Sequence, residues 1–203
     1  MLGNALLGVL LAPTSSTTAV ASTDDAGARG HQCHGTPDGS QPVYRWVTLV
    51  DQRNVVTHAE LVYIAAHTDF DQGVSMETTD VVSAEASASA SVHASAGVWL
   101  AKAETTVSAS LKVFGSHTTR KTVDHHFTVH ASKHRKRMAF FEGVRFFKLQ
   151  WHYRNCNARP SPYYRHGRLS SYSAAPAYGN ALCPHSRYKR GSMLYTATLA
   201  AGC

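Results

Sequence analysis

The longest regular pattern in the chain runs from residue 82 to residue 100, where small apolar side chains alternate with polar ones. Alternate side chains of a strand point to opposite faces of a sheet, whereas a helix repeats every 3.6 residues or so. The pattern therefore predicts a long amphipathic strand. A helix and a flexible Ser/Ala linker are the alternatives, because alanine favours helices and is depleted in strands.

A second alternating segment, residues 105–113, is the candidate partner of this strand. The phase shifts by one residue near Glu104, as it does at a bulge or a turn. The two segments together predict a long amphipathic hairpin. Its apolar face comprises Val82, Ala84, Ala86, Ala88, Ala90, Val92, Val98, Val107, Leu111 and Val113.

Further strands are predicted on both sides of the hairpin. They cover residues 43–50, 122–132, 138–153 and, as a short final strand, 190–203. In 122–132 the apolar face is Val123, Phe127, Val129 and Ala131. Residues 55–68 fit a strand or a short helix, because their central apolar run has no diagnostic period.

These elements predict an all-β protein, an elongated antiparallel sheet or sandwich with a long amphipathic hairpin. A strand from 82 to 100 would span roughly 60 Å. After Cys156, prolines, glycines and tyrosines occur without a period, which predicts a disulfide-closed C-terminal loop. We expect one β domain at 43–203, preceded by an extended arm at 22–42 that is rich in Gly, Asp, Ser and Pro.

Residues 1–21 have the layout of a secretory signal peptide. A short apolar run at 5–12 precedes the small-x-small site Ala19-Val20-Ala21. No Lys or Arg precedes the run, so an apolar N-terminal strand or helix is the alternative. We therefore expect a secreted protein.

The cysteines support export. There are four of them, Cys33, Cys156, Cys183 and Cys203, and an even number in an exported chain predicts two disulfides. Several pairings are open, among them Cys156–Cys183 with Cys33–Cys203. A free or intermolecular Cys203 is the alternative.

The net charge of +7 at pH 7 and the 13 histidines indicate an acidic partner. Outside a cell this would be an anionic membrane or cell-surface polymer. The candidate contact is the basic corner formed by Lys133, Arg135, Lys136 and Arg137. The nearby His126, His130 and His134 would gain charge around pH 5 to 6, which predicts a pH switch.

Motifs for catalysis and metal binding are missing from the sequence. There is no GxSxG, HExxH, P-loop or glycine-rich dinucleotide turn, so we expect no enzyme and no cofactor. Histidines at alternate positions of a strand lie nearly 7 Å apart, so a solvated polar face is predicted and no metal site. His31, Cys33 and His34 could also serve as metal ligands by residue type, but we still expect no metal site.

Basic and aromatic residues gather in the last third of the chain. They are Tyr163, Tyr164, Arg165, Arg168, Tyr188, Lys189 and Arg190. Such residues stack on nucleic-acid bases, and they are equally typical of carbohydrate and protein contacts. The expected extracellular compartment argues against nucleic acid.

The alternation of Ser and Thr with small apolar residues at 82–98 and 105–113 resembles the insertion hairpin of the aerolysin-like β-pore-forming family. The resemblance lies in residue type and alternation, and it covers roughly residues 74 to 153. It implies a secreted toxin or defence protein that oligomerises and inserts a hairpin into a membrane. Lys102 and Glu104 depart from that pattern. The chain is also similar to small secreted actinobacterial β-proteins of unknown role.

The leading prediction is therefore a secreted, membrane-active, pore-forming protein. The alternative is a secreted, non-catalytic binding or adaptor module that recognises a protein partner or an acidic cell-surface polymer. In that case the alternating strands belong to a soluble sheet.

Overall fold

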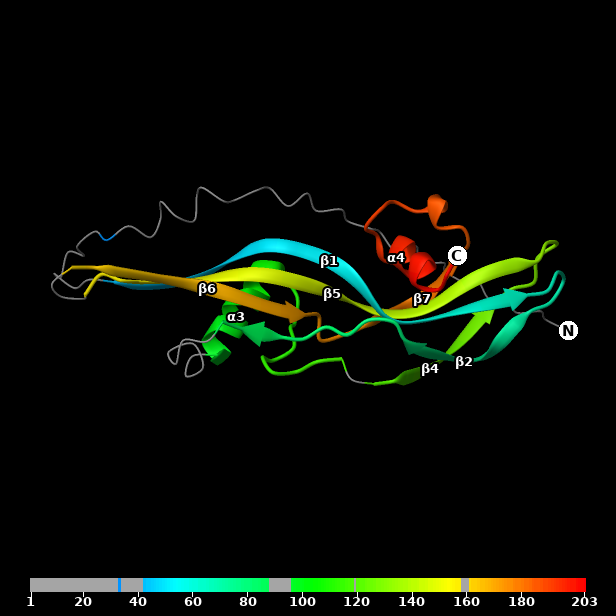
Figure 1. The fold of residues 1–203 in the computed structure, drawn as a ribbon, viewed down its shortest axis with the longest axis horizontal. Helices are drawn as coiled ribbons and strands as arrows, with labels where there is room; N and C mark the ends of the chain where they lie inside the picture. Colours follow the sequence, from blue (N-terminus) through cyan, green and yellow to red (C-terminus); the bar gives the residue numbers. More distant parts are fainter. Residues whose placement is uncertain (1–32, 34–41, 88–95, 119, 158–160) are drawn as a thin grey trace, which may run out of the picture. The chain divides into compact units, whose positions relative to one another are not determined.

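The computed structural model describes residues 33, 42–87, 96–118, 120–157 and 161–203 (Figure 1). Contacts between Cα atoms divide the chain into the units Met1–Gln32 and Cys33–Cys203. Only the second unit is described below. The predicted signal peptide and all of the predicted arm except Cys33 and Pro42 lie outside the described residues.

The second unit is built on one antiparallel sheet of seven strands, which confirms the all-β prediction. The strands are β1 (Val43–Ile64), β2 (Phe70–Thr78), β3 (Glu85–Ala86), β4 (Thr122–Val129), β5 (Lys136–Asn155), β6 (Tyr163–Tyr172) and β7 (Ala177–Leu182). Their order across the sheet is β3-β6-β5-β1-β2-β4, and β7 also pairs with β5.

Two long strands form the centre of this sheet. β1 has 22 residues and β5 has 20, and they pair from Val43–Asn155 to Ile64–Lys136. At about 3.3 Å per residue, such a pair spans roughly 65 Å. The register shifts between Leu49 and Asp51 and between Val56 and His58. The segment at 55–68 that could have been helical is thus mainly strand.

The β2–β4 pair folds over one face of β1 and β5. β1 pairs with β2 only at His58–Thr78 and Ala59–Glu77, after which the strands diverge (Figure 1). The buried cluster between the layers contains Ile64, Phe70, Val74, Met76, Val123, Phe127, Val129, Met138 and Phe140. This confirms the predicted apolar face of the 122–132 strand at Val123, Phe127 and Val129, whereas the predicted Ala131 is exposed and lies beyond the end of β4.

The opposite face of β5 is covered by helix α4 (Met193–Ala200), where the sequence predicted a strand. The helix begins at Ser192, whose Oγ accepts a hydrogen bond of 3.2 Å from the Tyr195 amide. Its Ala197 packs against Phe141, whereas the neighbouring Phe140 belongs to the other layer. β5 is therefore buried on both faces here, which explains its run of consecutive apolar residues.

The prediction of an amphipathic hairpin is wrong for residues 96–107, which the structure describes as a helix. Ala96–Val107 forms helix α3, which buries Trp99 and Ala103 one turn apart. The helix packs on β1, β5 and β6, and the rings of Trp99 and Trp151 lie 5.3 Å apart. Small alternating side chains gave little contrast between faces, so the helical spacing of the buried residues was missed.

The other hairpin positions do not share one environment. Val82, Ala84 and Leu111 are buried, Ala86 and Val107 are partly buried, and Val98 and Val113 are exposed. The predicted positions Ala88, Ala90 and Val92 lie outside the described residues. The described residues of this segment therefore cover the sheet as a helix and connecting loops, with no continuous apolar stripe.

All four cysteines are paired, as predicted. The bonds are Cys33–Cys156 and Cys183–Cys203. The second bond closes the C-terminal segment that carries α4. The residues between Cys156 and Cys183, predicted as a loop, instead contain β6 and β7. Among the described residues, no helix is both long enough and apolar enough to cross a membrane.

Candidate functional site

Three strands bring aromatic and cationic side chains together at one end of the sheet. In the register, Trp46 of β1 lies beside His152 of β5, which lies beside His166 of β6. Two residues further along β5, Arg154 lies beside Tyr164 of β6. Side chains at every second position share a face. We call the face formed by these five residues the aromatic–cation surface.

The side chains of this surface stack on one another. The Trp46 and His152 rings are nearly parallel, 8° apart, with centroids at 4.9 Å. Tyr164 is tilted against Trp46 at 6.1 Å and against His166 at 5.5 Å. The Arg154 guanidinium carbon lies 5.6 Å from the Tyr164 centroid, within the range of a cation–π contact. The stacking holds the rings in fixed positions.

Hydrogen bonds hold His152 between two strands. Its Nε2 lies 3.0 Å from the Thr48 hydroxyl, and its Nδ1 bonds to the Tyr164 hydroxyl. Tyr164 still has 45% of its surface exposed. The surface is therefore ordered by contacts within the protein and remains open to a ligand at its outer strand.

The opposite face of the same strands also carries arginines packed against aromatic rings. The guanidinium carbon of Arg45 lies 5.2 Å from the Tyr153 ring centroid, and that of Arg165 lies 5.1 Å from the Tyr163 centroid. The two tyrosine rings are 5.8 Å apart. Arginine and tyrosine thus occur on both faces of this end of the sheet.

The tyrosines here have shifted pKa values. A hydrogen bond from Tyr153, with further help from Asn155 and Arg165, lowers the pKa of Tyr163. Burial raises the pKa of Tyr153, and its hydrogen bond to Tyr163 adds to this. Burial also raises the pKa of Tyr164, against the opposing effect of Arg154. The positive charge of this end of the sheet at neutral pH therefore comes from its arginines.

The sequence around β6 and the second half of β5 carries positive charge and no acidic residues to offset it. Residues 143–203 contain nine Lys and Arg residues and no Asp or Glu. All of β6 and the part of β5 from Gly143 onward, which carry four of the five residues of the surface, lie in this region. This acid-free stretch was a sequence signal that could have identified the surface.

Sequence reasoning found one of the five residues of this surface, Tyr164. It singled out Tyr163, Tyr164, Arg165 and Arg168, all of which lie on β6. It missed the residues that β1 and β5 supply, because their position beside β6 depends on strand pairing. Tyr188 lies apart, where its hydroxyl accepts a hydrogen bond of 2.8 Å from the Leu182 amide.

The predicted basic corner lies at the other end of β5. Lys133, Arg135 and Arg137 are exposed, and Lys136 is partly buried, with its Nζ donating to the His130 carbonyl at 2.9 Å. The structure therefore separates these cations from the aromatic–cation surface by most of the length of β5.

The predicted histidine switch lies on exposed positions. His126, His130 and His134 all face solvent, which agrees with a polar strand face. His126 Nδ1 lies 3.7 Å from an Asp71 carboxylate oxygen. Among the described residues, no group of His, Cys, Asp and Glu could hold a metal ion.

No protein-family model, curated protein or solved structure matches this chain.

Proposed function

We propose that this protein is a secreted, non-catalytic binding module that holds an acidic cell-surface polymer on its aromatic–cation surface. The observation that carries the proposal is the stacked group of Trp46, His152 and Tyr164, with Arg154 against its outer ring. Flat rings offer stacking faces, and arginine binds carboxylate or phosphate through paired hydrogen bonds.

The spacing of the surface favours a repeating ligand. Side chains two positions apart on a strand are separated by about 7 Å, and neighbouring strands by about 5 Å. Arg154, His152 and the residues beside them thus form a regular array rather than one deep site. A chain of charged sugar or phosphate units can occupy several positions of such an array at once. The two disulfides are compatible with an extracellular location.

The geometry gives less support to insertion of the predicted hairpin. Helix α3 would have to withdraw Trp99 and Ala103 from the core, and its connections would withdraw Val82 and Leu111. The aromatic–cation surface requires no such rearrangement. We therefore favour polymer binding over pore formation as the function.

The test is binding of the oxidised protein to immobilised polygalacturonate, a carboxylate polymer. Neutral dextran and single-stranded DNA serve as comparison ligands. We expect Tyr164→Ala and Arg154→Gln each to weaken polygalacturonate binding about tenfold, since each removes one contact of about 1–3 kcal/mol. The control Arg187→Gln removes an exposed cation outside the surface and should leave affinity unchanged within about twofold.

Three outcomes would count against the proposal. Equal loss in Arg187→Gln would reduce the binding to general charge attraction. Preference for DNA would make the ligand nucleic acid. Absence of binding to any acidic polymer would remove the assigned ligand class.

A further inference from the structure

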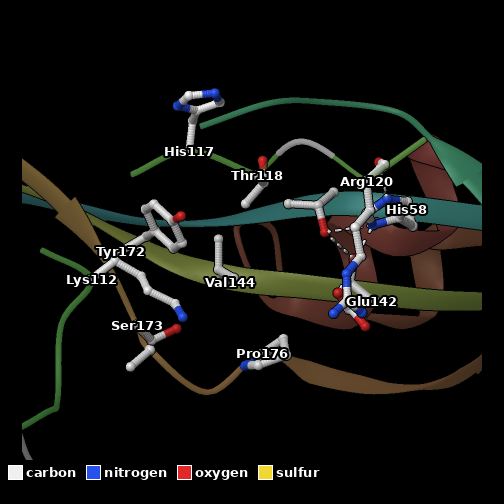
Figure 2. Close-up of a pocket in the computed structure, with 12 residues that line it drawn as sticks. His58, Lys112, His117, Thr118, Arg120, Glu142, Val144, Tyr172, Ser173 and Pro176 are labelled. Atoms are coloured by element: carbon white, nitrogen blue, oxygen red, sulfur yellow. Dashed lines mark hydrogen bonds and ion pairs between the residues drawn. The ribbon is translucent and has the colours of Figure 1, made fainter. Parts of the chain in front are cut away.

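A pocket separate from the aromatic–cation surface lies between the middle of the central strands β1 and β5 and described residues that precede β4. Its volume is about 270 Å³ (Figure 2). Four parts of the chain line it: the middle of β1, the segment before β4 through Lys112, His117, Thr118 and Arg120, the middle of β5, and residues 172–176 from the end of β6 toward β7. None of the residues that line it belongs to the proposed polymer-binding surface.

Among the described residues that line the pocket, only Glu142 has a carboxylate, and two histidines lie close to it. His125 Nε2 donates to Glu142 Oε2 at 2.7 Å. His58 Nδ1 lies 4.0 Å from Glu142 Oε1 and is almost fully buried, with 3% of its side chain exposed. The carboxylate is therefore partnered from within the protein and does not need the cations at the rim.

His58 also holds one side of the rim in place. Its Nε2 lies 2.9 Å from the Arg120 carbonyl oxygen, which can only accept, so this nitrogen carries the proton. The Thr78 hydroxyl donates to the same carbonyl at 2.7 Å. The backbone of Arg120 is thus anchored beside the pocket although its side chain is exposed.

Two cations border the pocket from opposite sides. Figure 2 shows Lys112 beside Tyr172 and Ser173, and Arg120 beside His58 and Glu142. Among the described residues, neither Lys112 nor Arg120 forms an ion pair with a carboxylate. An anion between them would meet two positive groups without displacing an existing partner.

Uncharged groups complete the lining. Tyr172 is 4% exposed, and in Figure 2 its hydroxyl points into the pocket. In that position the hydroxyl can donate a hydrogen bond to a ligand. Val144 and Pro176 add an apolar wall.

We infer that this pocket binds a small ligand carrying one oxyanion group, either carboxylate or phosphate. Lys112, Arg120 and the Tyr172 hydroxyl supply donors to the oxyanion, and hydrogen bonds to charged acceptors are stronger than neutral ones. The volume is slightly below the usual range of about 300–1,000 Å³ for ligand pockets, which limits the ligand to a small molecule. This site does not depend on polymer binding.

The test is an NMR titration of the oxidised chain with inorganic phosphate and, separately, with acetate, at constant ionic strength set with chloride. We expect saturable shifts confined to residues that line the pocket. Arg120→Gln and Lys112→Gln should each weaken binding about tenfold, and Tyr172→Phe several-fold. The matched control is Lys121→Gln, because Lys121 is an exposed cation next to Arg120 that does not line the pocket.

Saturation by either anion supports the site, and the tighter anion identifies the ligand's group. Shifts that grow without saturation, or equal weakening in Lys121→Gln, would overturn the inference. Tyr164→Ala should bind phosphate as the unmodified chain does. Loss of polymer binding with retained phosphate binding would therefore separate failure of the proposed function from failure of this site.

Discussion

His125 Nε2 on β4 donates a hydrogen bond of 2.7 Å to Glu142 Oε2 on β5. The two strands are not neighbours in the sheet, so this bond joins the folded-over β2–β4 layer to the central strands. The His125 ring also stacks on Tyr178 of β7, with centroids 4.4 Å apart. One partly buried carboxylate thus fixes the position of one layer against the other.

We predict that Glu142→Gln lowers the free energy of unfolding by about 1–3 kcal/mol, because His125 loses a charged acceptor in a partly buried position. Urea denaturation followed by tryptophan fluorescence measures this. Asp71→Asn is the matched control, since Asp71 pairs with His126 at the exposed surface. It should cost less than about 0.5 kcal/mol. Equal losses in both variants would contradict a special role for Glu142.

The helix at Ala96–Val107 can be tested with one pair of substitutions. Alternation predicts that residues 101 and 103 share a face, whereas in α3 Ala101 is exposed and Ala103 is 1% exposed. We expect Ala103→Asp to lower the free energy of unfolding by about 3 kcal/mol or more, since it buries a carboxylate without a partner. Ala101→Asp should change it by less than about 0.5 kcal/mol. Similar losses at both positions would support the strand.

The Tyr153–Tyr163 pair predicts an asymmetric titration of two neighbouring phenols. The hydrogen bond from Tyr153 stabilises the Tyr163 phenolate and lowers its pKa, so Tyr163 should ionise below its ordinary value of 10.0 as the pH rises. Tyr153→Phe removes that donor and should move the Tyr163 pKa upward. Absorbance of phenolate against pH, with Tyr163→Phe to assign the transition, measures the shift. An unchanged curve in Tyr153→Phe would show that the hydrogen bond is not the cause.

Membrane insertion makes a prediction that differs from polymer binding. Because the described part of the 82–113 segment contributes buried residues to the sheet's core, we expect no dye release from anionic liposomes at pH 7.5 or 5.5. Release accompanied by large oligomers would restore the pore-forming prediction. Liposome binding that increases at the lower pH without release would instead support the predicted switch at His126, His130 and His134.

The local sequence determined those elements in which large apolar side chains mark one face clearly against the other. The run at 138–153 predicted β5, and the alternation of Val123, Phe127 and Val129 predicted the buried face of β4. Large apolar side chains in a regular period have one sheet face on which they can be buried, so pattern and structure agree there. Of the candidate surface, only Tyr164 was singled out from the sequence, within the run of aromatic and basic residues from Tyr163 to Arg168.

Tertiary structure decided what small or distant residues do. Alanine and serine at 82–107 fit a strand, a helix or a loop at similar cost, so packing of Trp99 against Trp151 selected the helix for Ala96–Val107. Disulfide pairing and the meeting of Trp46, His152 and Tyr164 depend on residues far apart in the chain. The amino-acid sequence by itself determined a β-rich, cationic, cysteine-paired chain, and the register of β1, β5 and β6 decided where its aromatic and charged groups meet.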